Sequence, residues 1–299
     1  MSRAPDAGLS WGVALRLGRV SNLPTVWSNV LAGLALAGGA AELGLLVVAI
    51  LVALSLFYVG GMYLNDAFDA TIDAAERPER PIPSGAVSRA TVFALGFGML
   101  GAGLAILAGL GLSGAVATGL RPAIGGLALA AAIVLYDWRH KANPLSPLVM
   151  GLCRVLLYVT AGLCVAVPLP SPLWIGAALI LCHLIGLTYV AKQETLGRVE
   201  NLWPLIFLAA PVVYGAVLAV ERPVVAIFWL VLTGWIVVAL RFVQRRGPGD
   251  IPRAVVSLIA GISLLDAMLI AGTGALGLAG VALVAFVVTL VFQRAIPGT

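Results

Sequence analysis

The sequence predicts an all-α protein that crosses a membrane many times, a polytopic transmembrane helical bundle of nine or ten helices. Of its 299 residues, 61% are hydrophobic and only 10% are charged, whereas soluble domains carry about 25% charged residues. Its mean hydropathy is +1.08. A membrane-spanning helix needs about 20 mostly apolar residues, and apolar stretches of that length follow one another along the chain. We therefore expect a single membrane domain over residues 1–299.

Ten apolar stretches are candidate spans, and residues 9–20 before them predict an interfacial amphipathic helix rather than a signal-peptide core. The stretches are residues 22–41, 44–64, 90–111, 116–136, 146–167, 172–191, 202–220, 223–241, 253–271 and 275–293. The fourth is the weakest because Arg121-Pro122 lies inside or beside it. The count falls to nine if the last hairpin does not cross fully.

The basic residues predict the orientation of the bundle. Of 18 lysines and arginines, only Arg121 and Arg222 fall in loops on one side. The positive-inside rule makes the opposite side cytoplasmic. The net charge of +5 therefore indicates topology. We expect the lipid bilayer of a cell membrane (the inner membrane if bacterial) as the surroundings and no nucleic acid as a partner.

Three carboxylates and an amide stand where the second apolar stretch ends, at Asn65, Asp66, Asp69 and Asp73. If the helix continues through them, their side chains fall within an arc of roughly 100°. Carboxylates on one face repel each other unless a cation lies between them, and Mg²⁺ prefers one or two carboxylates together with a substrate's phosphate oxygens. Acidic residues at a helix C-terminus also oppose the macrodipole. The pattern predicts a Mg²⁺–diphosphate site at a membrane surface.

A loop rich in proline and arginine follows, with the sequence Arg77-Pro78-Glu79-Arg80-Pro81-Ile82-Pro83-Ser84-Gly85. Together with the spacing of Asn65, Asp66, Asp69 and Asp73, this loop closely resembles the first aspartate-rich motif of the UbiA-type intramembrane prenyltransferases. The resemblance extends over most of the chain through loop order and span number, and it implies a UbiA-like bundle. Members of that family use Mg²⁺ to bind an isoprenoid diphosphate and transfer the prenyl group to an acceptor.

The resemblance also implies roles for individual residues of this motif. Asn65, Asp69 and Asp73 match the metal ligands of the family, and Asp66 stands beside them as a substrate-binding residue. Arg77 and Arg80 are candidates for contact with the substrate, although both could instead pair with Glu76, Glu79 or lipid phosphates.

The loop after the sixth stretch departs from the family pattern. A second aspartate-rich motif is expected there, but the chain reads Tyr189-Val190-Ala191-Lys192-Gln193-Glu194-Thr195. We expect Tyr189 and Glu194 to bind substrate and Lys192 to cover part of a diphosphate's charge. This variant is similar to a divergent branch of the superfamily that includes the EboC-like proteins. It leaves open a second hypothesis, a non-catalytic isoprenoid- or lipid-binding or transport protein on the same scaffold.

Four further charged residues are candidates for the site. Arg139 and Lys141 resemble the family's diphosphate contacts between spans four and five. Arg154 lies about two turns into the fifth stretch, where a charge costs several kcal/mol unless it is paired; we expect Asp137 or the diphosphate as its partner. Asp266 should face the bundle interior for the same reason, where it binds an acceptor, pairs with an arginine or stays protonated.

The expected chemistry is stabilisation of a leaving group. Mg²⁺ on Asp69 and Asp73, with Lys141, Arg154 and Lys192, would neutralise the departing diphosphate, so that the allylic C–O bond ionises and a hydrophobic acceptor, aromatic or lipid-like, captures the carbocation. The CDP-alcohol phosphotransferases also use Asp-x-x-x-Asp at a membrane surface. Their upstream Asp-Gly-x-x-Ala-Arg element has no counterpart, because residues 50–64 contain no Asp and no Arg.

Overall fold

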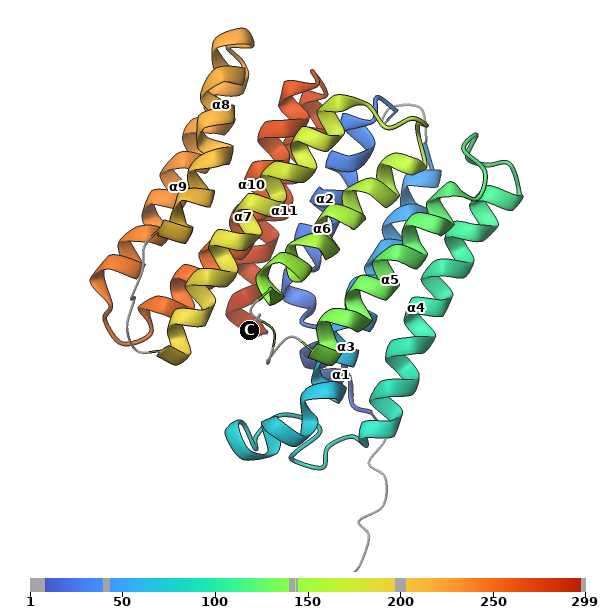
Figure 1. Cartoon of the computed structure of the whole chain (residues 1–299), viewed down its shortest axis with the longest axis vertical. Coiled ribbons are helices and arrows are strands. Elements are labelled where there is room, and N and C mark those ends of the chain that lie inside the picture. The colour runs from blue at the N-terminus through green and yellow to red at the C-terminus, as the bar shows by residue number, and fades with distance from the viewer. Residues whose placement is uncertain (1–8, 40–43, 140–142, 144, 197–202, 297–299) are drawn as a thin grey trace, which may run out of the picture.

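The computed structural model describes residues 9–39, 44–139, 143, 145–196 and 203–296, and the regular structure of these residues is helical (Figure 1). In chain order the elements are α1 (Trp11–Leu17), the 3₁₀ turn η1 (Val20–Asn22), α2 (Leu23–Leu36), α3 (Leu46–Glu76), α4 (Arg89–Leu112), α5 (Arg121–Arg139), α6 (Ser146–Leu163), α7 (Ser171–Leu196), η2 (Trp203–Leu208), α8 (Ala209–Glu221), α9 (Val225–Arg245), α10 (Asp250–Gly272) and α11 (Leu276–Ala295).

Each of the ten predicted spans contains a helix, and in the described part of the chain eight helices are long and apolar enough to cross a membrane. The other two are α2, which has only 14 residues, and α5, which begins and ends with arginine. A helix of 14 residues is about 21 Å long, less than the hydrocarbon thickness of about 30 Å. The predicted all-α polytopic membrane fold is confirmed.

Helix α10 forms the core of one half of the bundle. In its most apolar stretch 83% of the residues are buried, against 22% in α9 and α11. It packs against α2, α7, α9 and α11. Figure 1 shows α8 and α9 on one flank of the bundle and α4 and α5 on the other. Large apolar side chains such as Phe97, Ile124, Ile227 and Val284 are exposed, as expected for helices whose outer faces contact lipid tails.

The basic segments lie at one end of the bundle, the lower end in Figure 1, where α1, the loop between α3 and α4, the last turn of α7 and the turn between α9 and α10 are found. Arg121 and Arg222 stand at the opposite end, at the start of α5 and just after α8. The alternation of spans thus gathers the basic segments as the sequence predicts. The assignment of that end to the cytoplasm stays a prediction.

Close contact between α2 and α6 depends on Gly33. A Cβ at Gly33 would lie 2.7 Å from the carbonyl oxygen of Tyr158 and 2.9 Å from Cβ of Ala161. Small residues let membrane helices approach closely enough for side chains to form hydrogen bonds between them. Asn29, one turn before Gly33, is fully buried and accepts a hydrogen bond from Arg154 of α6 across this contact.

Candidate active site

Helix α3 continues through the acidic residues, as the sequence predicts, and ends at Glu76. The stop is explained by Pro78, because the residue before a proline is disfavoured in the α conformation. Four polar side chains of its last three turns are almost fully buried, with exposed fractions of 2–7%. We call this set the acidic face of α3; it consists of Asn65, Asp66, Asp69 and Asp73. Buried carboxylates are costly unless cations or hydrogen-bond donors compensate them.

Arg80 supplies one of the compensating cations. Its Nη1 lies 2.7 Å from Oδ2 of Asp73 and 3.6 Å from Oδ1 of Asp66. The loop that carries it is a compact turn, held by backbone hydrogen bonds such as Ser84 N–H to the Arg80 carbonyl, and Gly85 adopts the left-handed conformation with φ +77°. Arg77 is exposed. The proline-rich loop therefore folds back so that Arg80, rather than Arg77, contacts the carboxylates of Asp66 and Asp73.

Arg19 supplies the second cation from the segment between α1 and α2. Its Nη2 donates to Asp66 Oδ1 at 3.1 Å and to Asn65 Oδ1 at 3.4 Å. Arg19 has φ +41°, a left-handed conformation that costs a non-glycine residue roughly 1–3 kcal/mol. The phenol of Tyr58 donates to the Arg19 carbonyl at 3.2 Å and helps to hold it. The conformation is retained because it directs the guanidinium onto α3.

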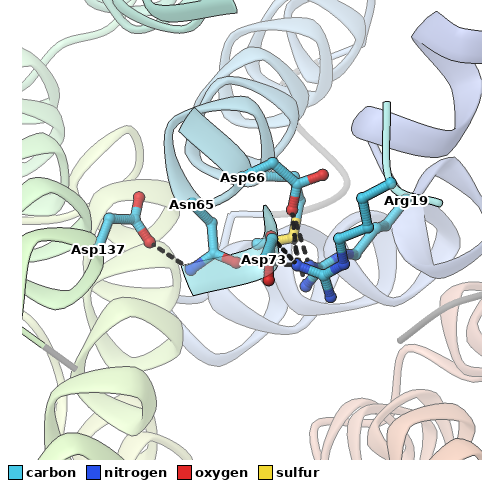
Figure 2. Close-up of polar contacts among 7 residues, drawn as sticks. Arg19, Asn65, Asp66, Asp73 and Asp137 are labelled. Carbon is cyan, nitrogen blue, oxygen red and sulfur yellow. Dashed lines mark hydrogen bonds and ion pairs between the residues drawn. The ribbon is translucent and has the colours of Figure 1, made fainter. Parts of the chain in front are cut away.

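Asp137 approaches the acidic face from the other side. Asn65 Nδ2 donates to Asp137 Oδ1 at 3.1 Å, and Asp137 is buried on the last turn of α5. Figure 2 shows Arg19 and Asp137 on opposite sides of Asn65. An amide has an acceptor oxygen and two N–H donors, so Asn65 can link the guanidinium to the carboxylate. The site thus draws on three separate parts of the chain.

The donor set fits a divalent cation that is shared with a diphosphate. Asp66, Asp69, Asp73 and Asp137 outnumber the two guanidinium groups described above. Among the described residues, no group of three or more His, Cys, Asp and Glu side chains is placed to hold a metal ion. Mg²⁺, however, is usually bound by one or two carboxylates plus waters and substrate phosphates. Such an ion fits the acidic face, whereas an ion held by protein ligands alone does not.

The protein partners of Arg154 differ from Asp137, the one the sequence suggested. Its Nη1 donates to Asn29 Oδ1 at 2.6 Å and its Nη2 to Thr25 Oγ1 at 3.1 Å. Its guanidinium also lies 5.7 Å from the ring centre of Tyr58. Asp137, the protein partner expected for Arg154, accepts a hydrogen bond from Asn65 instead. Arg154 is therefore anchored to α2.

Asp266 faces the bundle interior, as predicted, and is fully buried. Its Oδ2 accepts hydrogen bonds from Ser28 at 2.5 Å and from Asn29 Nδ2 at 2.7 Å. Its Oδ1 accepts one from the Tyr158 phenol, and Ser263 bonds to Ser28 at 2.9 Å. We call this set the buried polar network; it consists of Thr25, Ser28, Asn29, Arg154, Tyr158, Ser263 and Asp266. It joins α2, α6 and α10.

The remaining candidate site residues lie at the ends of α5 and α7 and in the segments that follow them. Tyr189 and Lys192 lie in the last two turns of α7 and are partly buried. Arg139 is exposed, and its guanidinium stacks on the neighbouring Trp138 at 4.3 Å from the ring centre. Lys141 and the side chain of Glu194 lie outside the described residues.

Two residues of these sites carried a weak signal in the sequence. Arg19 counted there only as a basic residue on the positive side, although it directly precedes the first span. Asn29 is a polar residue inside the first predicted span, a position that favours either the lining of a cavity or a hydrogen bond between helices, and it makes two hydrogen bonds between helices, with Arg154 and Asp266. Both act through contacts with segments distant in the sequence, which spacing along the chain does not reveal.

Fold and site together define a class, an integral membrane protein of helices with a buried carboxylate site at one end of the bundle. The sequence profile of the UbiA prenyltransferase family matches residues 26–258 of this chain. The chain therefore belongs to the UbiA prenyltransferase family and is a prenyltransferase.

Relatives agree with this assignment, and a solved structure has the same kind of fold. The chain is 31% identical over 223 residues to a digeranylgeranylglyceryl phosphate synthase of Methanopyrus kandleri, a match that covers 73% of this chain and 76% of the relative. It is 38% identical over 125 residues to the enzyme of the same name from Methanoregula boonei, covering 39% of this chain and 40% of that one. A solved structure of a digeranylgeranylglyceryl phosphate synthase has a similar fold, with a TM-score of 0.62 at 17% identity, covering 87% of this chain and 97% of that chain.

Proposed function

We propose that the protein, as one membrane domain, transfers the prenyl group of a polyprenyl diphosphate to a lipid-like acceptor that carries a hydroxyl group. The donor's diphosphate would bind at the acidic face of α3 in the presence of Mg²⁺. The observation that carries this proposal is the burial of Asp66, Asp69 and Asp73 beside Arg19 and Arg80. The names of the relatives support a lipid-like acceptor.

In this proposal the chain's own residues bind and orient the diphosphate. Asn65, Asp69 and Asp73 would hold the metal, which when bound neutralises the diphosphate and makes it a better leaving group. Arg19 and Arg80 already lie on the carboxylates and can donate charged hydrogen bonds to phosphate oxygens. Their planar guanidinium groups suit phosphate, which accepts two parallel N–H groups.

In the transfer step one carbon–oxygen bond of the donor breaks and one carbon–oxygen bond to the acceptor forms. The allylic C–O bond of the donor breaks, and its electron pair leaves with the diphosphate. The acceptor's hydroxyl oxygen bonds to the allylic carbon, and its proton passes to the released diphosphate. The apolar walls of the bundle exclude water, which would otherwise capture the carbocation. No side-chain nucleophile is required, since the protein acts by stabilising charge.

The other sequence-predicted residues keep supporting roles in the proposal. Lys192 and Tyr189 at the end of α7 would bind the diphosphate from the side opposite to α3, together with Glu194, two residues after Lys192, and Lys141, two residues after Arg139. Arg77 and Arg139 would attract it from the surface. The site would open to the cytoplasm, following the distribution of basic residues.

Donor use in lipid nanodiscs tests the proposal. Geranylgeranyl diphosphate is added with and without Mg²⁺, together with a panel of hydroxyl lipids and aromatic acceptors, and diphosphate release is measured. The proposal expects Mg²⁺-dependent release with a hydroxyl lipid, abolished in Asp69→Asn/Asp73→Asn. Glu76→Gln is the matched control, because Glu76 lies on the same helix but is exposed. Donor binding without diphosphate release would support a non-catalytic role. Diphosphate release that is unchanged in Asp69→Asn/Asp73→Asn would show that the donor binds at another site.

A further inference from the structure

The segment that carries Arg19 needs contacts from other parts of the chain to keep its shape. α1 ends at Leu17, and η1 has only three residues, Val20–Asn22. Arg19 between them adopts the left-handed conformation with φ +41°, and its side chain does not cap η1. Such a conformation is strained for a residue with a side chain, and it persists only where the surrounding structure holds it. The position of the Arg19 guanidinium therefore depends on the contacts that hold this turn.

Asn22 closes the turn and connects it to α11. Its backbone N–H donates to the Arg19 carbonyl at 3.0 Å, the same oxygen that accepts from the Tyr58 phenol. The side-chain oxygen of Asn22 accepts a hydrogen bond from Nε2 of Gln293 at 2.9 Å. Gln293 lies in the last turn of α11, which packs against η1 and α2 and ends toward the same end of the bundle as α1 (Figure 1). A hydrogen bond between residues 271 positions apart thus holds the turn of Arg19.

Stability alone does not explain a glutamine at this position. The other polar atom of its amide, Oε1 of Gln293, is buried and has no hydrogen-bond partner among the residues the structure describes. A buried acceptor without a partner destabilises the folded state, and an apolar side chain of similar size would avoid that cost. What the glutamine provides, and an apolar side chain would not, is the hydrogen bond to Asn22. Its role is therefore tied to the turn rather than to the packing of α11.

A displacement of this turn would be felt at the acidic face of α3. Nη2 of Arg19 lies 3.1 Å from Oδ1 of Asp66 and 3.4 Å from Oδ1 of Asn65. Its other terminal nitrogen, Nη1, meets the sulfur of Met62 at 3.7 Å, and a thioether is a weak acceptor. A group that binds a ligand must be held to within about 0.5 Å of its productive position. The anchor of the turn on α11 therefore affects how well Arg19 meets a ligand at the acidic face.

We propose that Gln293 is a positioning residue for Arg19: its hydrogen bond to Asn22 keeps the Arg19 guanidinium at the acidic face, where the diphosphate of the prenyl donor would bind. This inference rests on the proposed function and adds to it a residue that touches neither substrate. The last turn of α11 thereby controls the affinity for the prenyl donor through a turn at the other end of the chain.

Measurements of prenyl-donor binding and of unfolding on the same variants test the assignment. Gln293→Leu removes the N–H group that bonds to Asn22 together with the unpartnered oxygen. In lipid nanodiscs its affinity for geranylgeranyl diphosphate with Mg²⁺ should fall about 3- to 10-fold, the range of one hydrogen bond between neutral groups. Its midpoint of thermal unfolding in detergent should equal or exceed that of the wild type. Gln244→Leu is the matched control, because Gln244 is an exposed glutamine in the last turn of α9; it should leave both quantities unchanged.

A double-mutant cycle with Arg19 separates positioning from a general effect on the fold. Arg19→Gln should weaken the binding of geranylgeranyl diphosphate by about 10-fold. Gln293→Leu in that background should cause no further loss, because residues that act through one another are not additive. Gln293→Met, a second apolar variant of similar length, should behave as Gln293→Leu does and guards against a defect specific to leucine.

Three results would overturn the assignment: wild-type affinity for the prenyl donor in Gln293→Leu, an equal further loss of affinity in the Arg19→Gln background, or a lowered midpoint of unfolding that accompanies the loss of affinity. A failure of the proposed function would overturn the inference with it and is recognised separately. In that case Arg19→Gln and Asp69→Asn/Asp73→Asn would both leave the binding of geranylgeranyl diphosphate intact.

Discussion

The acidic face of α3 and the buried polar network both place charge inside the bundle, but they are built differently. In the first, guanidinium groups touch carboxylates directly, at 2.7 Å for Arg80 and Asp73 and 3.1 Å for Arg19 and Asp66. In the second, the Asn29 amide lies between Arg154 and Asp266. The first comes mainly from one helix, whereas the second joins α2, α6 and α10.

This difference indicates whether each site can bind and release charged ligands. Arg19 and Arg80 retain some exposure, 20% and 17% of their side chains, so their ion pairs can open toward an incoming diphosphate and metal. Asp266 and its donors are fully buried, and opening that network would leave a charge without partners, which costs several kcal/mol. The acidic face is therefore suited to binding and releasing charged ligands, while the network is suited to holding one side chain in a fixed position.

The largest expected effect concerns the acidic face. Asp69→Asn/Asp73→Asn removes two formal charges from the proposed metal site, and we expect the rate of prenyl transfer to fall by about 1,000-fold or more. Steady-state assays with geranylgeranyl diphosphate and Mg²⁺ measure the loss. Glu76→Gln should stay close to wild type. If both variants lose activity equally, general charge at this end of the bundle matters rather than these two ligands.

The next effect concerns the stability of the buried polar network. Asp266→Asn keeps the shape but replaces an acceptor oxygen by an NH₂ group that meets the donors of Ser28, Asn29 or Tyr158. We expect the free energy of unfolding to drop by about 3 kcal/mol, measured by thermal or denaturant unfolding in detergent. Ser263→Ala removes a peripheral hydroxyl and should cost about 1 kcal/mol. If Asp266→Asn leaves the free energy of unfolding unchanged, the carboxylate is not needed to hold the network.

A third prediction concerns the contact between α2 and α6 that positions Asn29 and Arg154. Gly33→Ala places a methyl group 2.7 Å from the Tyr158 carbonyl, so the helices must separate, at a cost of about 1–3 kcal/mol. Gly101→Ala is the matched control on α4, because a Cβ there meets nothing within 4 Å. Unfolding of the two variants gives the comparison. Equal stability would mean that the contact is loose enough to accept a methyl group.

The smallest effect separates the two arginines of the proline-rich loop. Arg80→Gln removes an ion pair to Asp73, and we expect the affinity for geranylgeranyl diphosphate to fall about 10-fold. Arg77→Gln changes an exposed side chain and should weaken binding by less than about 3-fold. Titration calorimetry in nanodiscs measures both. The opposite order would show that the loop rearranges when the donor binds.

Much of the acidic face could be predicted because its residues are neighbours on one helix. The spacing of Asn65, Asp66, Asp69 and Asp73 fixes them on one face once α3 continues to Glu76. The partners could not be predicted in the same way. Arg80 rather than Arg77 reaches the carboxylates because of how the turn folds, and Arg19 does so through a left-handed backbone conformation that composition does not indicate.

The sequence by itself determined that this protein is a helical membrane protein, where its spans lie, and which end of the bundle carries the acidic motif. Apolar length and helical periodicity are local properties, and they follow from a hydrogen-bonding backbone that must satisfy itself within lipid. Only the tertiary structure decided that Arg154 lies with Asn29 and Thr25 and that Asp266 completes the same network. Those contacts depend on how α2, α6 and α10 pack together, and packing between distant segments leaves no periodic trace in the sequence.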